Sequence, residues 1–170
     1  DAELLAGARA GDDIAFGLLI ERHARSAFAV AYGVVGDADL AEDVCQDALF
    51  RVWRRLGECR DPERFAAWLA RAVRRHALNA LRGRRETQAL ESVEVAATAP
   101  PPDLQAEHAD ARARLERALR ALPAEQRQAV LWFDLEGWSH AEIAETLGTT
   151  EAMSRQHVML ARRRLRQMLE

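Results

Sequence analysis

Apolar residues recur along this chain at spacings of three and four, the period of an α-helix that buries one face. The pattern predicts a short helix at 2–10 and longer ones near 12–35, 39–56 and 62–85. Four more are predicted near 104–122, 123–135, 139–147 and 150–169. Val, Ile, Thr, Tyr and Phe nowhere cluster in the alternating runs typical of strands. The chain is therefore predicted to be all-α.

Short sequence signals mark the expected ends of these helices. Asp39, with Glu42 three residues later, has the spacing of a capping box. Asp61 followed by Pro62 predicts the start of the long helix, because proline fits the first helical turn. The aspartate pair at 12–13 is placed to cap the helix that follows it.

A proline-rich stretch separates two groups of predicted helices. Its sequence, at 92–103, is SVEVAATAPPPD. Three consecutive prolines cannot continue a helix, and the composition suits an extended tether. We therefore expect two small helical bundles, a first domain at 1–90 and a second at 105–170, joined by a linker at 91–104.

The C-terminal part of the chain has the pattern of a helix-turn-helix. Ser139 with Glu142 predicts the start of a short helix, and Gly148 its left-handed end. A second helix follows at once, and in a helix-turn-helix this second helix enters the major groove of DNA. If the inward face is Ser154, Val158, Ala161 and Leu165, then Arg155 and Gln156 face outward. Arginine and glutamine side chains pair well with guanine and adenine edges respectively.

Charge is distributed unevenly along the chain. The sequence has 24 basic and 27 acidic residues, a net charge of −3, and every basic residue other than histidine is arginine. Residues 57–85 hold eight arginines against three acids, and 151–170 hold five against two. Two basic segments in an acidic background suggest two separate contacts with a polyanion, although a solvated arginine face is the plainer interpretation of the first segment taken alone.

Several classes of protein are not favoured by the sequence. Two cysteines and five scattered histidines do not form a disulfide framework or a four-ligand zinc site. No apolar run is long enough for a membrane span, no signal peptide is visible, and no glycine-rich phosphate loop occurs. We expect a cytoplasmic protein that is not an enzyme and needs no cofactor or metal. Cys45 is expected in the core, and Cys59, in a loop, is the more exposed candidate.

Four stretches in order carry a resemblance to a known family. They are GDADLAEDVCQDALFRVWRRL, RFAAWLARAVRRHALNALRGRR, LPAEQRQAVLWFDLEGWSHAEIAETLGTT and ARRRLRQML. The chain resembles an extracytoplasmic-function (ECF) sigma factor of bacterial RNA polymerase, of the type with only region 2 and region 4. The resemblance covers nearly the whole chain. It implies a factor that directs core RNA polymerase to specific promoters and starts strand opening by capturing a base of the −10 element. It also implies core RNA polymerase, promoter DNA and an anti-sigma factor as partners.

The resemblance implies a surface for core RNA polymerase on the helix near 39–56. Its members are Asp43, Gln46, Asp47, Phe50 and Arg54. The pattern itself agrees, because an apolar Phe50 in a polar, acidic stripe suits an interface better than a solvated face.

Two DNA-contacting sets follow from the same resemblance. The set for the −10 element lies in the loop before the basic helix and on that helix: Arg60, Asp61, Arg64, Arg71, Arg74, Arg75, His76 and Asn79. The set for the −35 element lies in the helix-turn-helix: Ser139, His140, Arg155, Gln156, Met159, Arg162 and Arg163.

The recognition helix departs from the family pattern, and two alternatives stay open. Ser154 stands where the family commonly has a buried valine, and Met159 with Leu160 replaces a polar or aromatic residue followed by arginine. The −35 sequence is therefore not predicted. The altered helix leaves room for a sigma-like interaction module that sequesters an anti-sigma factor. A conventional helix-turn-helix regulator is the other alternative, although no apolar face is spare for its dimer interface.

Overall fold

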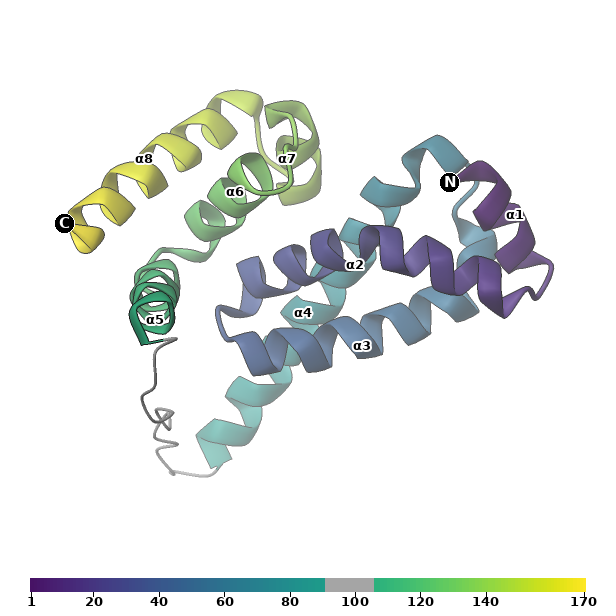
Figure 1. Cartoon of the computed structure of the whole chain (residues 1–170), viewed down its shortest axis with the longest axis horizontal. Coiled ribbons are helices and arrows are strands. Elements are labelled where there is room, and N and C mark those ends of the chain that lie inside the picture. The colour runs from purple at the N-terminus through teal and green to yellow at the C-terminus, as the bar shows by residue number, and fades with distance from the viewer. Residues whose placement is uncertain (91–105) are drawn as a thin grey trace.

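The computed structural model describes the backbone of residues 1–90 and 106–170 and the side chains of 1–84 and 110–170. Every regular element in these ranges is a helix, which confirms the all-α prediction (Figure 1). The first group holds α1 (Ala2–Arg9), α2 (Asp13–Val35), α3 (Ala38–Arg54) and α4 (Phe65–Leu90), with short 3-10 turns at Leu56–Glu58 and Pro62–Arg64. The second holds α5 (Ala106–Arg120), α6 (Ala124–Asp134), α7 (His140–Leu147) and α8 (Glu151–Leu169). The predicted linker, 91–104, lies entirely outside the described residues.

The predicted capping box at Asp39 is wrong, because α3 begins two residues earlier. Gly36 adopts the left-handed conformation that ends α2, with φ of 71°. This turn leaves Asp37 extended, and its Oδ1 accepts a hydrogen bond from the Leu40 amide at 3.0 Å. Asp37 is therefore the N-cap, and Asp39 lies inside the first turn, where its charge favours the positive end of the helix dipole.

The start predicted at Asp61 and Pro62 is present, but its first turn is not α-helical. Asp61 Oδ1 accepts a hydrogen bond from the Glu63 amide at 3.0 Å, as a cap does. The residues Pro62–Arg64 form a 3-10 turn, and α4 proper begins at Phe65, which is fully buried. Tight 3-10 turns are common where a helix begins.

The buried apolar residues of the two helical groups form one continuous hydrophobic core. In the first, α2 packs against α1, α3 and α4 around Leu19, Val30, Phe65 and Val73. In the second, α6, α7 and α8 surround Trp132 and Ile143, and the inward face of α8 is Ser154, Val158 and Ala161, as the pattern predicted. None of the described helices is both long and apolar enough to cross a bilayer.

The two groups also pack directly against each other, along α2 and α6 (Figure 1). The two helices lie close together at Gly33. A Cβ atom added to it would lie 3.1 Å from Gln128 Cγ and 3.3 Å from Gln128 Cα, tighter than ordinary van der Waals contact. The helices meet here because glycine has no side chain to hold them apart.

Arg127 of α6 joins the two groups by hydrogen bonds. Its side chain is only 6% exposed, and its guanidinium donates to the Gly33 and Val34 carbonyl oxygens at 2.9 Å each. These carbonyls belong to the last turn of α2, where no further helical amide can satisfy them. The same guanidinium donates to the carbonyl oxygens of Arg120 and Leu122 in its own group. Arg127 thus satisfies backbone acceptors on both sides of the α2–α6 interface.

Candidate nucleic-acid interface and partner surface

The polar stripe of α3 carries an exposed aromatic pair. Phe50 is 57% exposed and Trp53 43%, with ring centroids 6.3 Å apart in an edge-to-face arrangement. The Arg54 guanidinium lies over the Phe50 ring, 5.9 Å from its centroid. The other members of the predicted polymerase surface, Asp43, Gln46 and Asp47, are also exposed. All five side chains are therefore accessible to a partner.

Trp53 lies beside Phe50 on the same exposed face, and the sequence reasoning did not single it out. It stacks on Phe16 of α2 at a centroid distance of 5.9 Å, so one side of the ring is held and the other is open. A position three residues after Phe50 lies on the same side of a helix, and that spacing was the signal available in the sequence.

The predicted −10 residues of α4 are held between α3 and the second helical group. Arg64 Nη2 and Arg71 Nη1 both reach Glu145 Oε1 of α7, at 2.9 and 2.6 Å. Arg74 Nε donates to Gln128 Oε1 of α6 at 3.2 Å. Partial burial lowers the pKa of Arg74 from its ordinary value. Three predicted DNA-contacting arginines are thus engaged by the second group in this arrangement.

The remaining members of this set divide between the loop and the other side of α4. Arg60 in the loop is exposed, as are Arg75 and Asn79 on the helix. The carboxylate of Asp61 is used as the cap described above. His76 Nε2 lies 3.7 Å from Asp47 Oδ2, so the predicted −10 surface and the predicted polymerase surface meet between α3 and α4.

Both cysteines are buried, which overturns the expectation that Cys59 is exposed. Cys59 is only 2% exposed, and its thiol donates to the Asp61 carbonyl oxygen at 3.4 Å. Burial raises the pKa of the Cys59 thiol and raises that of Cys45 to about 11. Both thiols therefore stay protonated near neutral pH, and the thiol is the unreactive form.

Alkylation measures this burial directly. At pH 8 the folded protein is expected to react with iodoacetamide at least tenfold more slowly than a free thiol, at both cysteines, because neither is accessible as a thiolate. In denaturant both are expected to react at the free-thiol rate. Mass spectrometry of the quenched reaction gives the two rates. Fast modification of Cys59 in the folded protein contradicts the structure of the loop.

The helix-turn-helix presents four predicted base-contacting or phosphate-contacting side chains to solvent. Arg155, Gln156, Met159 and Arg163 are all exposed on α8, Met159 by 60%. The turn before this helix is made by Gly148, at φ of 69°. Arg155 Nη2 pairs with Glu151 Oε2 at 2.7 Å within the same helix.

Three other members of the −35 set have structural contacts. Ser139 and Glu142 form the predicted capping box of α7. His140 stacks on Phe133 with centroids 4.4 Å apart, and its Nδ1 lies 3.0 Å from the hydroxyl of buried Ser154. Arg162 forms a two-bond ion pair with Asp134. The hydroxyl at position 154, where a valine was expected, thus has a partner in His140.

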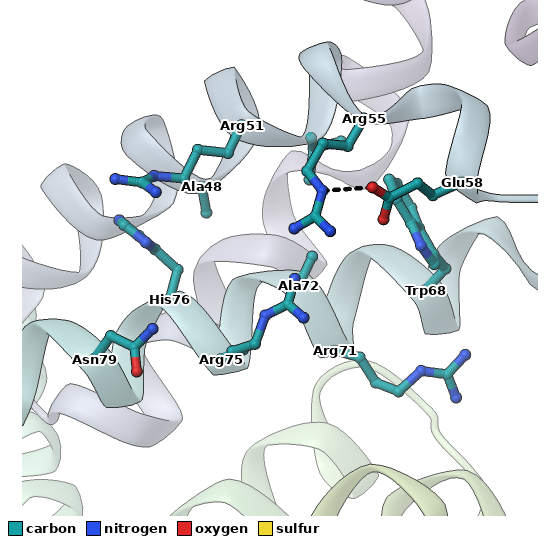
Figure 2. Close-up of a pocket in the computed structure, with 11 residues that line it drawn as sticks. Ala48, Arg51, Arg55, Glu58, Trp68, Arg71, Ala72, Arg75, His76 and Asn79 are labelled. Atoms are coloured by element: carbon teal, nitrogen blue, oxygen red, sulfur yellow. Dashed lines mark hydrogen bonds and ion pairs between the residues drawn. The ribbon is translucent and has the colours of Figure 1, made fainter.

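A cationic groove separates α3 from α4 (Figure 2). Its volume is about 420 Å³. It is lined by the charged and polar side chains of Arg51, Arg55, Glu58, Arg71, Arg75, His76 and Asn79, and by Ala48, Val52, Trp68 and Ala72. The sequence reasoning did not single out Arg51 or Arg55, because the packing of α3 against α4 decides which arginines share a groove. In the part of the chain described with side chains, no three His, Cys, Asp or Glu residues gather as metal ligands would.

Family models match both helical groups. Residues 19–87 match the model described as Sigma-70 region 2, and residues 112–165 the model described as Sigma-70, region 4. The ECF RNA polymerase sigma factor SigM of Mycobacterium tuberculosis is 37% identical over 171 residues, which cover 99% of this chain and 84% of SigM.

Two solved structures have a similar fold. The sigma factor RpoE of Bartonella quintana, in complex with the anti-sigma factor NepR, matches with a TM-score of 0.73 and 27% identity, over 91% of this chain and 96% of RpoE. CnrH, in complex with the cytosolic domain of CnrY, matches with a TM-score of 0.69 and 26% identity, over 99% of this chain and 96% of CnrH.

Proposed function

Because the chain belongs to the ECF sigma factors, which direct core RNA polymerase to specific promoters, we propose that its two helical groups divide this task. Residues 1–90 are the region 2 domain, for core polymerase and the −10 element. Residues 105–170 are the region 4 domain, for the −35 element, and 91–104 link them. The chain acts as a transcription initiation factor in the cytoplasm, without catalysis of its own.

The observation that carries the proposal for region 2 is the exposed aromatic pair on α3. Phe50 and Trp53 lie in a polar, acidic stripe, and aromatic residues at the centre of a polar surface are typical of protein interfaces. This face binds core polymerase. The loop around Arg60 and the arginines of α4 then hold the −10 strand, and capture of an extruded base offsets the few kcal/mol that unstacking costs.

Region 4 reads duplex DNA through the outer face of α8. Gln156 is exposed and able to pair with adenine, while Arg155 can pair with guanine. Met159 offers an apolar contact of the kind that suits a thymine methyl group. Arg163 contacts phosphate. Ser139 caps α7, His140 stacks on Phe133, and Arg162 pairs with Asp134, and these contacts support a role in holding α7 and α8 at the DNA backbone.

An anti-sigma factor is the proposed regulator. Both similar structures are complexes, and the partner of RpoE in one of them is the anti-sigma factor NepR. The rival function, a module that only sequesters an anti-sigma factor, shares this partner, so partner binding does not separate the two. Promoter-dependent transcription separates the two functions.

Transcription with purified core polymerase tests the proposal. With supercoiled promoter DNA, the chain is expected to produce transcripts from defined start sites that core enzyme alone does not produce. The variant Gln156→Ala is expected to reduce these transcripts about tenfold, since one paired base contact is worth about 1–3 kcal/mol of discrimination. Gln167→Ala, on the same helix but near its C-terminal end, is the matched control. Binding of an anti-sigma factor without any start site contradicts the proposal and favours the rival.

A further inference from the structure

We propose that Ser154 is a positioning residue for DNA binding: its buried hydroxyl donates a hydrogen bond to His140 Nδ1 and so directs His140 Nε2–H toward a backbone phosphate. The inference rests on the proposed function, because it takes the helix-turn-helix as the part of the chain that docks on duplex DNA. It deepens that function by giving a role to a side chain that lies inside the motif. The two residues belong to its two helices, α7 and α8.

The Ser154 hydroxyl is buried and has one partner. The side chain is 0% exposed, and its Oγ lies 3.0 Å from His140 Nδ1. Among the described residues, His140 is the only hydrogen-bond partner of this hydroxyl. A buried hydroxyl whose proton has no acceptor loses the hydrogen bond that water supplied in the unfolded chain. We therefore assign the Ser154 proton to the bond with His140, and Nδ1 as the acceptor.

The direction of this hydrogen bond fixes the tautomer of His140. A neutral imidazole carries one proton, and when one ring nitrogen accepts a hydrogen bond, the other is the N–H donor. With Nδ1 as the acceptor, the proton is on Nε2. Nε2 is not buried and has no protein partner in the part of the chain described with side chains, so it can donate to a ligand. Valine, the residue expected at position 154 from the family pattern, has no proton to give to Nδ1.

The plane of the His140 ring is fixed by a different contact. The ring stacks on Phe133 of α6, with centroids 4.4 Å apart and 14° between the planes. Phe133 is held in turn, because the Arg162 guanidinium lies 5.4 Å from its centroid and pairs with Asp134. Stacking on Phe133 sets the plane of the imidazole, and the bond from Ser154 sets which edge of the ring faces outward. Together the two contacts give Nε2–H one direction.

The place of His140 in the motif favours a phosphate as the acceptor. His140 is the first residue of α7, directly after the N-cap Ser139, where the helix dipole favours an anion. In a helix-turn-helix the first helix crosses the DNA backbone while the second enters the major groove. A phosphate diester oxygen accepts hydrogen bonds and cannot donate them. It therefore binds the Nε2–H tautomer of His140 and not the other one.

Two variants of nearly equal shape test the hydroxyl. Ser154→Thr keeps it, and Ser154→Val puts a methyl group in its place. On a promoter duplex whose start site has been mapped, the full chain with core polymerase is expected to bind about fivefold more weakly as Ser154→Val than as Ser154→Thr, the effect of one hydrogen bond. The slope of log affinity against log salt is expected to be the same for both, because a neutral imidazole displaces no counterion. In a His140→Phe background, which keeps the stacking, the two variants are expected to bind equally.

NMR of the imidazole nitrogens tests the tautomer in the free chain, without DNA. The measurement is made at mildly alkaline pH, where an imidazole is neutral. The unmodified chain and Ser154→Thr are expected to give the signature of the Nε2–H tautomer at His140, and Ser154→Val a mixture of both tautomers. The signal of His140 is identified by its absence in His140→Phe.

Three results overturn the inference. The first is an Nδ1–H tautomer at His140 in the unmodified chain, and the second is equal promoter binding by Ser154→Thr and Ser154→Val. The third is an equal difference between them in the His140→Phe background, which means that the hydroxyl acts only through the packing of α8. If thermal denaturation shows that either variant does not fold, Ser154→Ala against the unmodified chain repeats the comparison. Failure of the proposed function appears separately, as absence of start sites with the unmodified chain.

Discussion

Replacing Gly33 with leucine is expected to separate the two helical groups. Even a Cβ atom at this position lies 3.1 Å from Gln128 Cγ, and a leucine side chain has no space between α2 and α6. Overpacking of this kind costs about 1–3 kcal/mol, and separation also removes the carbonyl partners of Arg127 on α2. We expect a larger radius of gyration by small-angle X-ray scattering.

The same variant is expected to bind single-stranded DNA more tightly, about three- to tenfold. In the closed arrangement Arg64 and Arg71 pair with Glu145, and Arg74 with Gln128, so separation frees three cations, one in the turn before α4 and two on α4. Each of the two exposed ion pairs with Glu145 is worth about 0.2–1 kcal/mol, and the expected gain, about 0.6–1.4 kcal/mol, lies within their sum. The milder variant Glu145→Gln is expected to show part of the gain without separation.

Gly17→Leu is the control for this experiment. Gly17 lies on the same helix, and a Cβ atom there has nothing within 4 Å. Leucine also favours the helix by up to about 1 kcal/mol at either site, so this contribution cancels in the comparison. An unchanged radius of gyration in Gly33→Leu means that the α2–α6 interface adapts, and that the close approach at Gly33 does not hold the groups together.

Replacing Phe50 with alanine is expected to weaken binding to core polymerase by about ten- to thirtyfold. Exposed aromatic residues at the centre of an interface commonly contribute about 2 kcal/mol or more. Phe50 is more than half exposed, so its loss is expected to leave thermal stability nearly unchanged. The double variant Phe50→Ala, Trp53→Ala is expected to abolish measurable binding, with some loss of stability because Trp53 also packs on Phe16.

Leu135→Ala is the matched control for the polymerase experiment. Leu135 is 55% exposed, close to the value for Phe50, and lies at the end of α6 in the second group. Biolayer interferometry with immobilised core enzyme gives both affinities. Equal effects of Phe50→Ala and Leu135→Ala would place the polymerase-binding face elsewhere on the molecule.

The sequence was sufficient where the physical cause is local. The capping box at Ser139 and Glu142, the left-handed Gly148 and the inward face of α8 depend on residues within a turn or two, and all are present. Where two local signals competed, the prediction failed: Asp37, placed by the turn at Gly36, caps α3 in place of Asp39. The exposure of Phe50 could also be predicted, because the spacing of apolar residues along α3 places Phe50 opposite the buried face of the helix.

The candidate sites could be predicted only in part. Helical periodicity predicts on which face of its helix a residue lies, but not which other element packs against that face. Arg51 and Arg55 were not singled out, since only the packing of α3 on α4 makes them line one groove with Arg75. The prediction that Cys59 is exposed was wrong, because the burial of its side chain depends on the fold of the loop.

By itself, the sequence determined the helices, their buried faces and the resemblance from which the family was inferred, since helical period and capping act over a few residues. Only the tertiary structure decided that the two helical groups pack together. The contact between Arg127 and Gly33 joins residues 94 positions apart, and that between Arg71 and Glu145 joins residues 74 apart. No local pattern encodes such pairings, because each needs a partner on the other helical group. The Arg127 contact, for example, needs a glycine that lets α2 and α6 approach and carbonyl oxygens left unsatisfied at the end of α2.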